Sequence, residues 1–321
     1  MKKTIYILVY LSICSTCFTQ SLIMDEAAKL FQTNQFKESL ELLNKVIEQN
    51  PNDMTALLSR SCVLDAMNDY EDALTDIETV IKSEPFNIEA VHIRAAICEN
   101  MGKHEKAIED ETIVLEKVPN YTSALNVRGM AYGNICLYND ALIDFTSAIS
   151  NGIKQGKNVA LYYLNRANIY FFMEDYNHAL EDVDVSISLN NKDVESFILK
   201  SKIYKRKGEF QTAIAWATKA IKMKPNYYEI YYLRIVEYLE LNQYKKAEND
   251  IAFIKDAMSG FSAYHAVLAF YYYKTENYLK SLEEVKISRE LKSKEKELFT
   301  IRIITDEVGD ILLQKIENSQ F

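Results

Sequence analysis

The sequence predicts an all-α protein built from stacked helical hairpins, and two observations carry that prediction. Glycine and proline number only 8 and 4 among 321 residues, too few for the many turns of an all-β sandwich or barrel. The prolines stand at positions 51, 85, 119 and 225, so two spacings are 34 residues and the third is three periods plus four residues. A fixed period in this range indicates a repeat architecture.

A second set of residues follows the same period. An aromatic residue stands three positions before a small one at Phe36 and Ser39, Tyr70 and Ala73, Tyr138 and Ala141, Tyr176 and Ala179, Phe210 and Ala213, Tyr244 and Ala247, and Tyr278 and Ser281. His104 and Ala107 fill the place that is missing between the second and third pairs. The steps are 34 residues except one of 38, which gives eight copies of one unit.

Each copy is expected to hold two amphipathic helices. Ala73, Ile77 and Val80 recur at intervals of three and four residues, as the apolar face of a helix requires. Short turns such as Asn68-Asp69 separate the two helices, and proline closes the second because it cannot continue the helical hydrogen bonds. The small residue lets the two helices approach closely. One hairpin cannot bury its apolar face alone, so the copies must stack.

The first helix of each copy adds a further pattern: Arg128-Gly129 with Tyr132, Arg166-Ala167 with Tyr170, and Lys200-Ser201 with Tyr204. Together with the period, the aromatic-small spacing and the terminal proline, it resembles the tetratricopeptide repeat family. The resemblance implies a right-handed α-solenoid of about eight repeats. Two features depart from the family pattern: the tryptophan near the start of the first helix is absent, and the glycine at the eighth position survives only at Gly129.

The expected organisation covers the whole chain. The repeats are placed at residues 20–53, 54–87, 88–121, 122–159, 160–193, 194–227, 228–261 and 262–295, with four extra residues in the fourth, around 151–158. Residues 296–321 are expected to form a C-terminal capping helix. One apolar stripe supports this cap, formed by Leu298, Ile301, Ile304, Val308, Ile311 and Leu312. Partner binding by the same stripe is the alternative.

Residues 1–19 have the layout of a signal peptide. A basic start at Lys2 and Lys3 precedes an apolar stretch that ends near Cys14, and small residues follow. We therefore expect an exported protein of bacterial type, periplasmic or secreted. A retained anchor and a lipoprotein, lipid-anchored through Cys14, remain as alternatives. The three later cysteines, Cys62, Cys98 and Cys136, are expected to be small buried residues.

A charge pattern repeats with the copies. Arginine at positions 60, 94, 128, 166 and 234 is followed sixteen residues later by aspartate at 76, 110, 144, 182 and 250. Where lysine replaces the arginine, at Lys200, the partner position holds Trp216. This joint change predicts that the two positions are in contact, within a repeat or across the neighbouring joint, and that the pairs fix the register of the helices.

No catalytic motif is evident, so an enzyme is not expected. The four histidines lie far apart in sequence, and neither a phosphate-binding glycine loop nor a G-x-S-x-G motif occurs. We accordingly expect no cofactor and no metal site, and His104, in the aromatic place of its copy, is expected to pack. The net charge of -9 argues against a nucleic-acid partner. No membrane span is expected in the mature chain.

The resemblance also implies a binding groove lined by the first helices. Transferring the family's ligand-contacting positions to this chain gives Asn126, Met130, Asn165, Asn168, Phe172, Lys202, Lys205, Arg206 and Tyr232. The three basic residues suit an acidic protein or peptide partner, although a solvated helix face explains them equally simply. The carboxylate clamp by which some relatives hold chaperone tails is not formed, because its places hold Asn126, Met130, Asn165, Glu195 and Leu199.

The function expected from these observations is that of a non-catalytic protein–protein interaction scaffold, which binds a peptide or protein segment in the concave groove. The alternative is an assembly or structural factor of the cell envelope. Such a factor would act through the edges of the solenoid and could be attached to the membrane as a lipoprotein.

Overall fold

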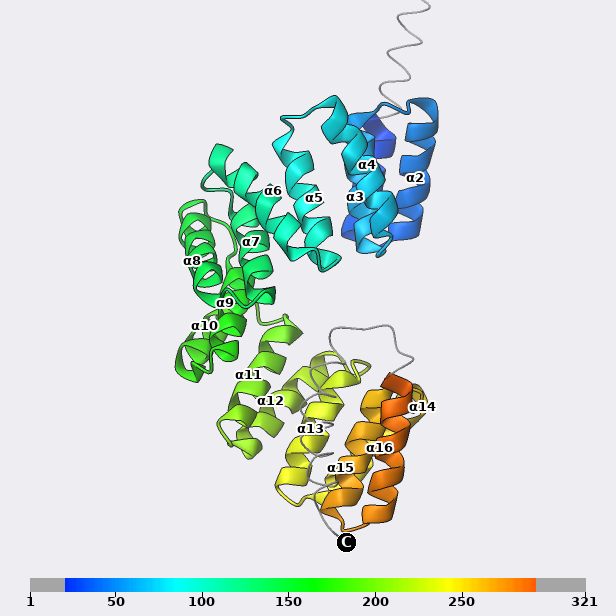
Figure 1. Ribbon diagram of the computed structural model, residues 1–321, viewed down its shortest axis with the longest axis vertical. Helices are drawn as coiled ribbons and strands as arrows, with labels where there is room; N and C mark the ends of the chain where they lie inside the picture. Colours follow the sequence, from blue (N-terminus) through cyan, green and yellow to red (C-terminus); the bar gives the residue numbers. More distant parts are fainter. Residues whose placement is uncertain (1–20, 293–321) are drawn as a thin grey trace, which may run out of the picture. The chain divides into compact units, whose positions relative to one another are not determined.

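The computed structural model describes residues 21–292, and every regular element in this part of the chain is a helix (Figure 1). The chain divides into two compact units, Met1–Lys157 and Asn158–Phe321. In both units each helix packs against the next one along the chain, and the first helices of successive hairpins also contact one another, as α3 and α5 do. This arrangement confirms the prediction of an α-solenoid of helical hairpins.

The first unit begins with helical residues 21–32. It continues with α2 (Phe36–Gln49), α3 (Met54–Ala66), α4 (Tyr70–Ser83), α5 (Ile88–Asn100), α6 (His104–Lys117), α7 (Thr122–Asn134) and α8 (Tyr138–Lys154). The second unit holds α9 (Ala160–Phe172), α10 (Tyr176–Leu189), α11 (Val194–Arg206), α12 (Phe210–Met223), α13 (Glu229–Glu240), α14 (Tyr244–Met258), α15 (Ser262–Lys274) and α16 (Tyr278–Lys292).

Local signals in the sequence account for where these helices start and stop. The Asp53 side chain accepts a hydrogen bond from the Ala56 amide at the start of α3, and Asn87 does the same for Ala90 at the start of α5. The turns within hairpins need a residue with positive φ, which Asn68 (φ 65°) supplies between α3 and α4. Asparagine is one of the residues that tolerate this conformation.

The small residues lie where the two helices of a hairpin cross. Ala73, Ala107 and Ala141 are all fully buried, as are their equivalents in later hairpins. Where serine takes the place, its hydroxyl reaches the facing helix: Ser39 Oγ donates to the Ala27 carbonyl at 2.8 Å, and Ser281 Oγ to the Ala269 carbonyl at 2.9 Å. A larger side chain would separate the two backbones, so the small position sets the hairpin's geometry.

Gly129 leaves space for a buried aromatic ring within one hairpin. A Cβ atom added at this position would lie 2.9 Å from Cε1 of Phe145, whose ring is 1% exposed. Phe145 belongs to α8, so the glycine in α7 makes room for an aromatic ring at the crossing of the two helices. A glycine in a helix interior costs about 1 kcal/mol relative to alanine, which the buried ring offsets.

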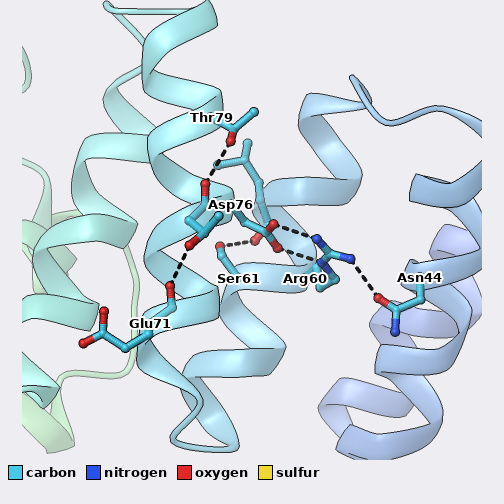
Figure 2. A network of polar contacts seen from close by, with 8 residues as sticks. Asn44, Arg60, Ser61, Glu71, Asp76 and Thr79 are labelled. Atoms are coloured by element: carbon cyan, nitrogen blue, oxygen red, sulfur yellow. Dashed lines mark hydrogen bonds and ion pairs between the residues drawn. The ribbon is translucent and has the colours of Figure 1, made fainter.

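The predicted arginine–aspartate contacts are confirmed, and all five lie within a hairpin. Each guanidinium donates through Nε and Nη2 to the two carboxylate oxygens of its aspartate at 2.7 or 2.8 Å. Figure 2 shows one of them, between Arg60 of α3 and Asp76 of α4. This bidentate geometry is the strongest arrangement available to the two groups.

Several of these arginines also contact the preceding hairpin. In Figure 2, Arg60 Nη1 points away from Asp76 and donates to Asn44 Oδ1 of α2 at 2.9 Å. Arg128 reaches Thr112 of α6 at 3.3 Å, and Arg234 reaches Thr218 of α12 at 3.0 Å. The partner on the preceding helix stands sixteen residues before the arginine, so one guanidinium joins three successive helices.

The exception at Lys200 keeps the contact but changes its chemistry. Lys200 Nζ lies 4.2 Å from the centre of the Trp216 ring, so a cation–π interaction replaces the ion pair. The same ammonium group forms an ion pair with Asp184, which stands sixteen residues earlier on α10. Lys200 thus joins α10, α11 and α12, as the arginines join three helices elsewhere.

The cysteines follow the prediction only in part. Cys98 is buried and Cys62 is half-buried, and burial raises the pKa of the Cys62 thiol to about 11. Cys136 is exposed, so the expectation that all three are buried is wrong for this residue. Its φ of 62° explains the position, because Cys136 occupies the tight turn between α7 and α8. All three are free thiols.

Two of the predicted segments, the signal peptide at residues 1–19 and the capping helix at 296–321, lie outside the described residues. Within residues 21–292, none of the helices combines the length and the apolar character that crossing a membrane requires.

The arginine–aspartate pairs predict a specific mutational response. Asp110 is fully buried while Arg94 keeps some exposure. Asp110→Ala leaves the guanidinium without its main partner, and we expect a loss of about 3 kcal/mol in the free energy of unfolding. Arg94→Met combined with Asp110→Leu should lose less than Asp110→Ala alone, because neither charge is then left buried and unpaired. Urea denaturation of the two variants measures the difference, and an equal or greater loss in the double variant would contradict this account.

Candidate functional site

Three of the groove candidates lie on one face of α9. Asn165, Asn168 and Phe172 are separated by three and four residues, so their side chains leave the helix on the same side. The two asparagines are half-buried, and Phe172, at the C-terminal end of the helix, is 50% exposed. Asn168 Nδ2 donates to the Leu164 carbonyl of its own helix at 3.0 Å, which leaves its amide oxygen directed away from that contact.

Three more candidates lie on one face of α11, and we call Lys202, Lys205 and Arg206 the basic cluster. The spacing of three and one places all three within about a turn of one another near the C-terminal end of the helix. Lys202 and Lys205 are half-buried, and Arg206 is exposed. A cation near a helix C-terminus interacts favourably with the unpaired carbonyl groups there, so the helix end stabilises the cluster's charge.

A shared apolar core brings these two helices together. Leu164 and Ala167 of α9 form one buried cluster with Leu199 and Ile203 of α11. These four residues are 6% exposed or less, so the contact between the two helices is shielded from solvent. The asparagines and Phe172 therefore stand on the helix next to the one that carries the basic cluster. We call the two sets of side chains together the α9–α11 face.

Acidic groups border the basic cluster on one side. Glu229 of α13 has its pKa raised chiefly by burial, while Tyr227 and the positive charge of Lys202 oppose the shift. Tyr227 lies beside Glu195 and Glu229, and its pKa is raised mainly by burial and further by these two carboxylates. Part of the charge of Lys202 is thus balanced locally.

A buried carboxyl group lies beneath the basic cluster. Glu237 of α13 is fully buried, and its Oε1 lies 3.2 Å from Ser201 Oγ of α11. Burial raises the pKa of Glu237 to about 8, against the opposing effects of Ser201, Lys205 and Arg234. Ser201 Oγ also donates to the Ala213 carbonyl at 2.8 Å. The one hydroxyl hydrogen of Ser201 is therefore used in this bond. Ser201 Oγ can in turn accept a hydrogen bond from a protonated Glu237.

The remaining candidates are placed differently. Tyr232 is 1% exposed and belongs to the core of the second unit, so its side chain contributes packing rather than a contact surface. Asn126 is buried and its Nδ2 lies 3.6 Å from Sδ of half-buried Met130, one turn along α7. These two residues belong to the first unit, so they are not part of the α9–α11 face.

The sequence reasoning missed a cluster in the first unit. His92 of α5 lies between two polar partners, with Nδ1 at 2.6 Å from Glu111 Oε1 of α6 and Nε2 at 3.0 Å from Ser123 Oγ of α7. The three residues are 19 and 31 positions apart, so no local motif marks them. The only available signal was the repeat itself, which stacks the first helix of one copy on the hairpin before it. His104, expected to pack, instead pairs with Glu99 at 2.8 Å.

No group of three or more histidine, cysteine, aspartate and glutamate side chains within residues 21–292 is arranged to hold a metal ion.

Comparison with known proteins identifies the class of repeat. Residues 160–193 and 194–227, which contain α9 to α12, match the family model described as tetratricopeptide repeat. These two copies are therefore tetratricopeptide repeats, and the other described helices form stacked hairpins of the same α-solenoid fold. Proteins with this repeat are generally non-catalytic scaffolds that bind protein partners. No curated protein sequence matches the chain.

Solved structures share the fold at low sequence identity. The chain resembles a crystal structure of the APC/C hetero-tetramer Cut9–Hcn1 with a TM-score of 0.66 and 14% identity, over 89% of this chain and 55% of that one. It therefore spans little more than half the length of that relative. It also resembles PilF of Pseudomonas aeruginosa (TM-score 0.54, 14% identity, 70% of this chain and 96% of that one). A tetratricopeptide repeat protein from Thermus thermophilus gives 0.51 at 15% identity, over 58% and 97%. At these identities the likeness shows the fold alone.

The buried Glu237 predicts a pH-dependent stability. Its pKa is about 8 when folded, against an ordinary value of 4.5, so folding favours the protonated form. The stability that this preference contributes is fully present below about pH 4.5 and is lost as the pH rises through about 8. Glu237→Gln keeps the neutral shape, so its melting temperature should exceed that of the wild type by more at pH 8 than at pH 5. Glu181→Gln, at an exposed position on α10, is the control. A constant difference between Glu237→Gln and wild type across this range would contradict the assignment.

Proposed function

We propose that this protein is an interaction scaffold whose α9–α11 face binds an acidic peptide segment that carries an apolar side chain. One observation supports this most directly: α11 carries a cluster of three basic side chains in an acidic protein, and the neighbouring helix α9 carries an exposed aromatic ring. Binding at this face requires no catalytic step.

The charge of the partner follows from the basic cluster. Arg206 is exposed and its planar guanidinium can hold a carboxylate through two parallel hydrogen bonds, while Lys205 adds a second positive charge one residue away. Glu195 and Glu229 border the cluster near Lys202. These carboxylates would repel an acidic segment that extended past Lys202, so they limit its position to the C-terminal half of α11.

The apolar part of the partner follows from α9. Phe172 is 50% exposed and Leu161, at the other end of the same helix, is 55% exposed. Burying exposed aromatic surface is a common source of binding energy at peptide interfaces. Asn165 and Asn168 lie between these two residues, and amide side chains can both donate to and accept from an extended peptide backbone.

Binding of a defined peptide tests this proposal. We expect a short fluorescein-labelled peptide, in which acidic residues flank one phenylalanine, to bind in a fluorescence anisotropy titration and to bind more weakly as salt is added. Lys202→Glu, Lys205→Glu and Arg206→Glu together should weaken binding by more than about tenfold, because attraction becomes repulsion. Phe172→Ala should weaken it without changing the salt dependence.

A matched control distinguishes binding at the α9–α11 face from an effect of the protein's net charge. Lys245, Lys246 and Lys255 are exposed on α14 of the same unit, and reversing all three changes the charge by the same amount. Equal weakening by the two triple variants would show that overall charge alone governs binding. No binding by the wild type would remove the proposal for this class of peptide.

We further propose that the chain is exported, on the strength of the basic-then-apolar pattern of its first nineteen residues. Mass spectrometry of the intact protein from the native membrane and soluble fractions tests this. We expect a mature chain that starts near Gln20. A chain that begins with a lipid-modified Cys14 would support the lipoprotein alternative, and one that retains residues 1–19 would contradict cleavage.

A further inference from the structure

The strongest unassigned feature is a chain of three polar side chains from three successive helices of the first unit. Ser123 Oγ lies 3.0 Å from His92 Nε2, and His92 Nδ1 lies 2.6 Å from Glu111 Oε1. Both distances are within hydrogen-bonding range. A hydroxyl next to an imidazole, with the imidazole oriented by a third group, is the arrangement that activates a serine as a nucleophile.

The exposed fraction of the three side chains rises from the glutamate to the serine, as a nucleophilic site requires. Glu111 is fully buried, the His92 side chain is 12% exposed, and Ser123 is half-buried. The carboxylate is therefore shielded from water while the hydroxyl keeps some access to solvent. The second carboxylate oxygen, Glu111 Oε2, has no hydrogen-bond partner in residues 21–292, so the bond to His92 is the main interaction that holds this carboxyl group. Burial raises the pKa of Glu111, against the opposing effect of His92.

A second histidine–glutamate pair in the same protein shows what distinguishes His92. His265 Nδ1 lies 2.6 Å from Glu284 Oε2, the same distance as in the first pair. His265 Nε2, however, lies 2.9 Å from the Ser259 carbonyl oxygen, which can only accept a hydrogen bond. His265 Nε2 must therefore carry a proton and cannot act as a base there. His92 Nε2 faces a hydroxyl, so it can accept the proton of Ser123 while Nδ1–H donates to Glu111.

We propose that Ser123, His92 and Glu111 form a nucleophilic triad that is acylated by small carboxylic esters. Ser123 Oγ attacks the carbonyl carbon as His92 Nε2 takes the hydroxyl proton. The bond from carbon to the leaving oxygen then breaks, and His92 returns the proton to the departing alcohol. Water attacks the acyl-serine by the same route and releases the carboxylic acid, which restores Ser123.

The position of Ser123 supplies donors for the negative oxygen that forms in this step. Ser123 is the second residue of α7, and the first amide groups of a helix have no acceptor within the helix. The residue before α7, Tyr121, offers them no side-chain acceptor. Backbone amides at such a place are a common means of stabilising an oxyanion. The Tyr121 ring packs against His92, with centroids 4.9 Å apart, and restricts the imidazole's orientation.

Labelling with a fluorophosphonate probe tests the nucleophile in the full-length protein. We expect covalent modification that peptide mass spectrometry assigns to Ser123, and a burst of p-nitrophenol when the protein is mixed with p-nitrophenyl acetate. Ser123→Ala should abolish both signals. His92→Gln should slow labelling by about a hundredfold, the lower part of the range for loss of a general base. Circular dichroism melting curves establish that each variant is folded.

Glu111 is a positioning residue, so its test needs a readout that a purely structural role would not move. Glu111→Gln should slow labelling of Ser123 and change the pH dependence of its rate, because the carboxylate no longer holds the imidazole's proton on Nδ1. Glu111→Asp should restore part of the rate. His265→Gln is the matched control, since it removes a histidine–glutamate pair with the same Nδ1 to carboxylate distance, and it should leave labelling unchanged.

Three results would overturn the proposal: no labelling of the folded wild type, labelling at a serine other than Ser123, or an unchanged rate in folded His92→Gln. Any of them would mean that the three side chains serve only to join α5, α6 and α7.

Discussion

The structure depends on one interaction that recurs along the chain, the contact of an arginine in the first helix of a hairpin with an aspartate in the second. The guanidinium also reaches the hairpin before it, as Arg60 does with Asn44. A hairpin with one apolar face could slide along its neighbour with little change in buried area, because burial is not directional. A bidentate pair has a fixed geometry, so it selects one register for three helices at once. The faces presented by α9 and α11 follow from that register.

Two departures from the repeat lie close together in the second unit. Lys200 and Trp216 replace the usual ion pair, and Glu237 takes a place on the first helix that is held in other hairpins by buried apolar residues such as Ile97 and Ile203. Glu237 lies against Ser201, the residue next to Lys200. The basic cluster lies on α11 as well. The proposed binding face therefore includes the helix whose contacts differ from those of the other hairpins. Departures of this kind concentrate at functional positions.

The two proposed sites differ in how far they could be foreseen. The basic cluster is visible in sequence because its members are neighbours on one helix. The contact between His92, Glu111 and Ser123 is not, because it joins three helices through side chains whose reach depends on how two copies are stacked. The same limit explains Tyr232, which the repeat position places in a groove and which the packing of α13 against its neighbours buries. It also explains Cys136, whose exposure follows from the turn it occupies.

The sequence by itself determined the helical hairpin, its period, the small residues at the crossings and the arginine–aspartate partners. Each of these is a local pattern that recurs in too many copies to arise by chance. Only the tertiary structure decided which side chains of different copies meet and which residues at equivalent positions are buried or exposed. The physical reason is that spacing along a helix fixes the direction of a side chain, while its neighbours depend on the distance and angle between helices that packing alone sets.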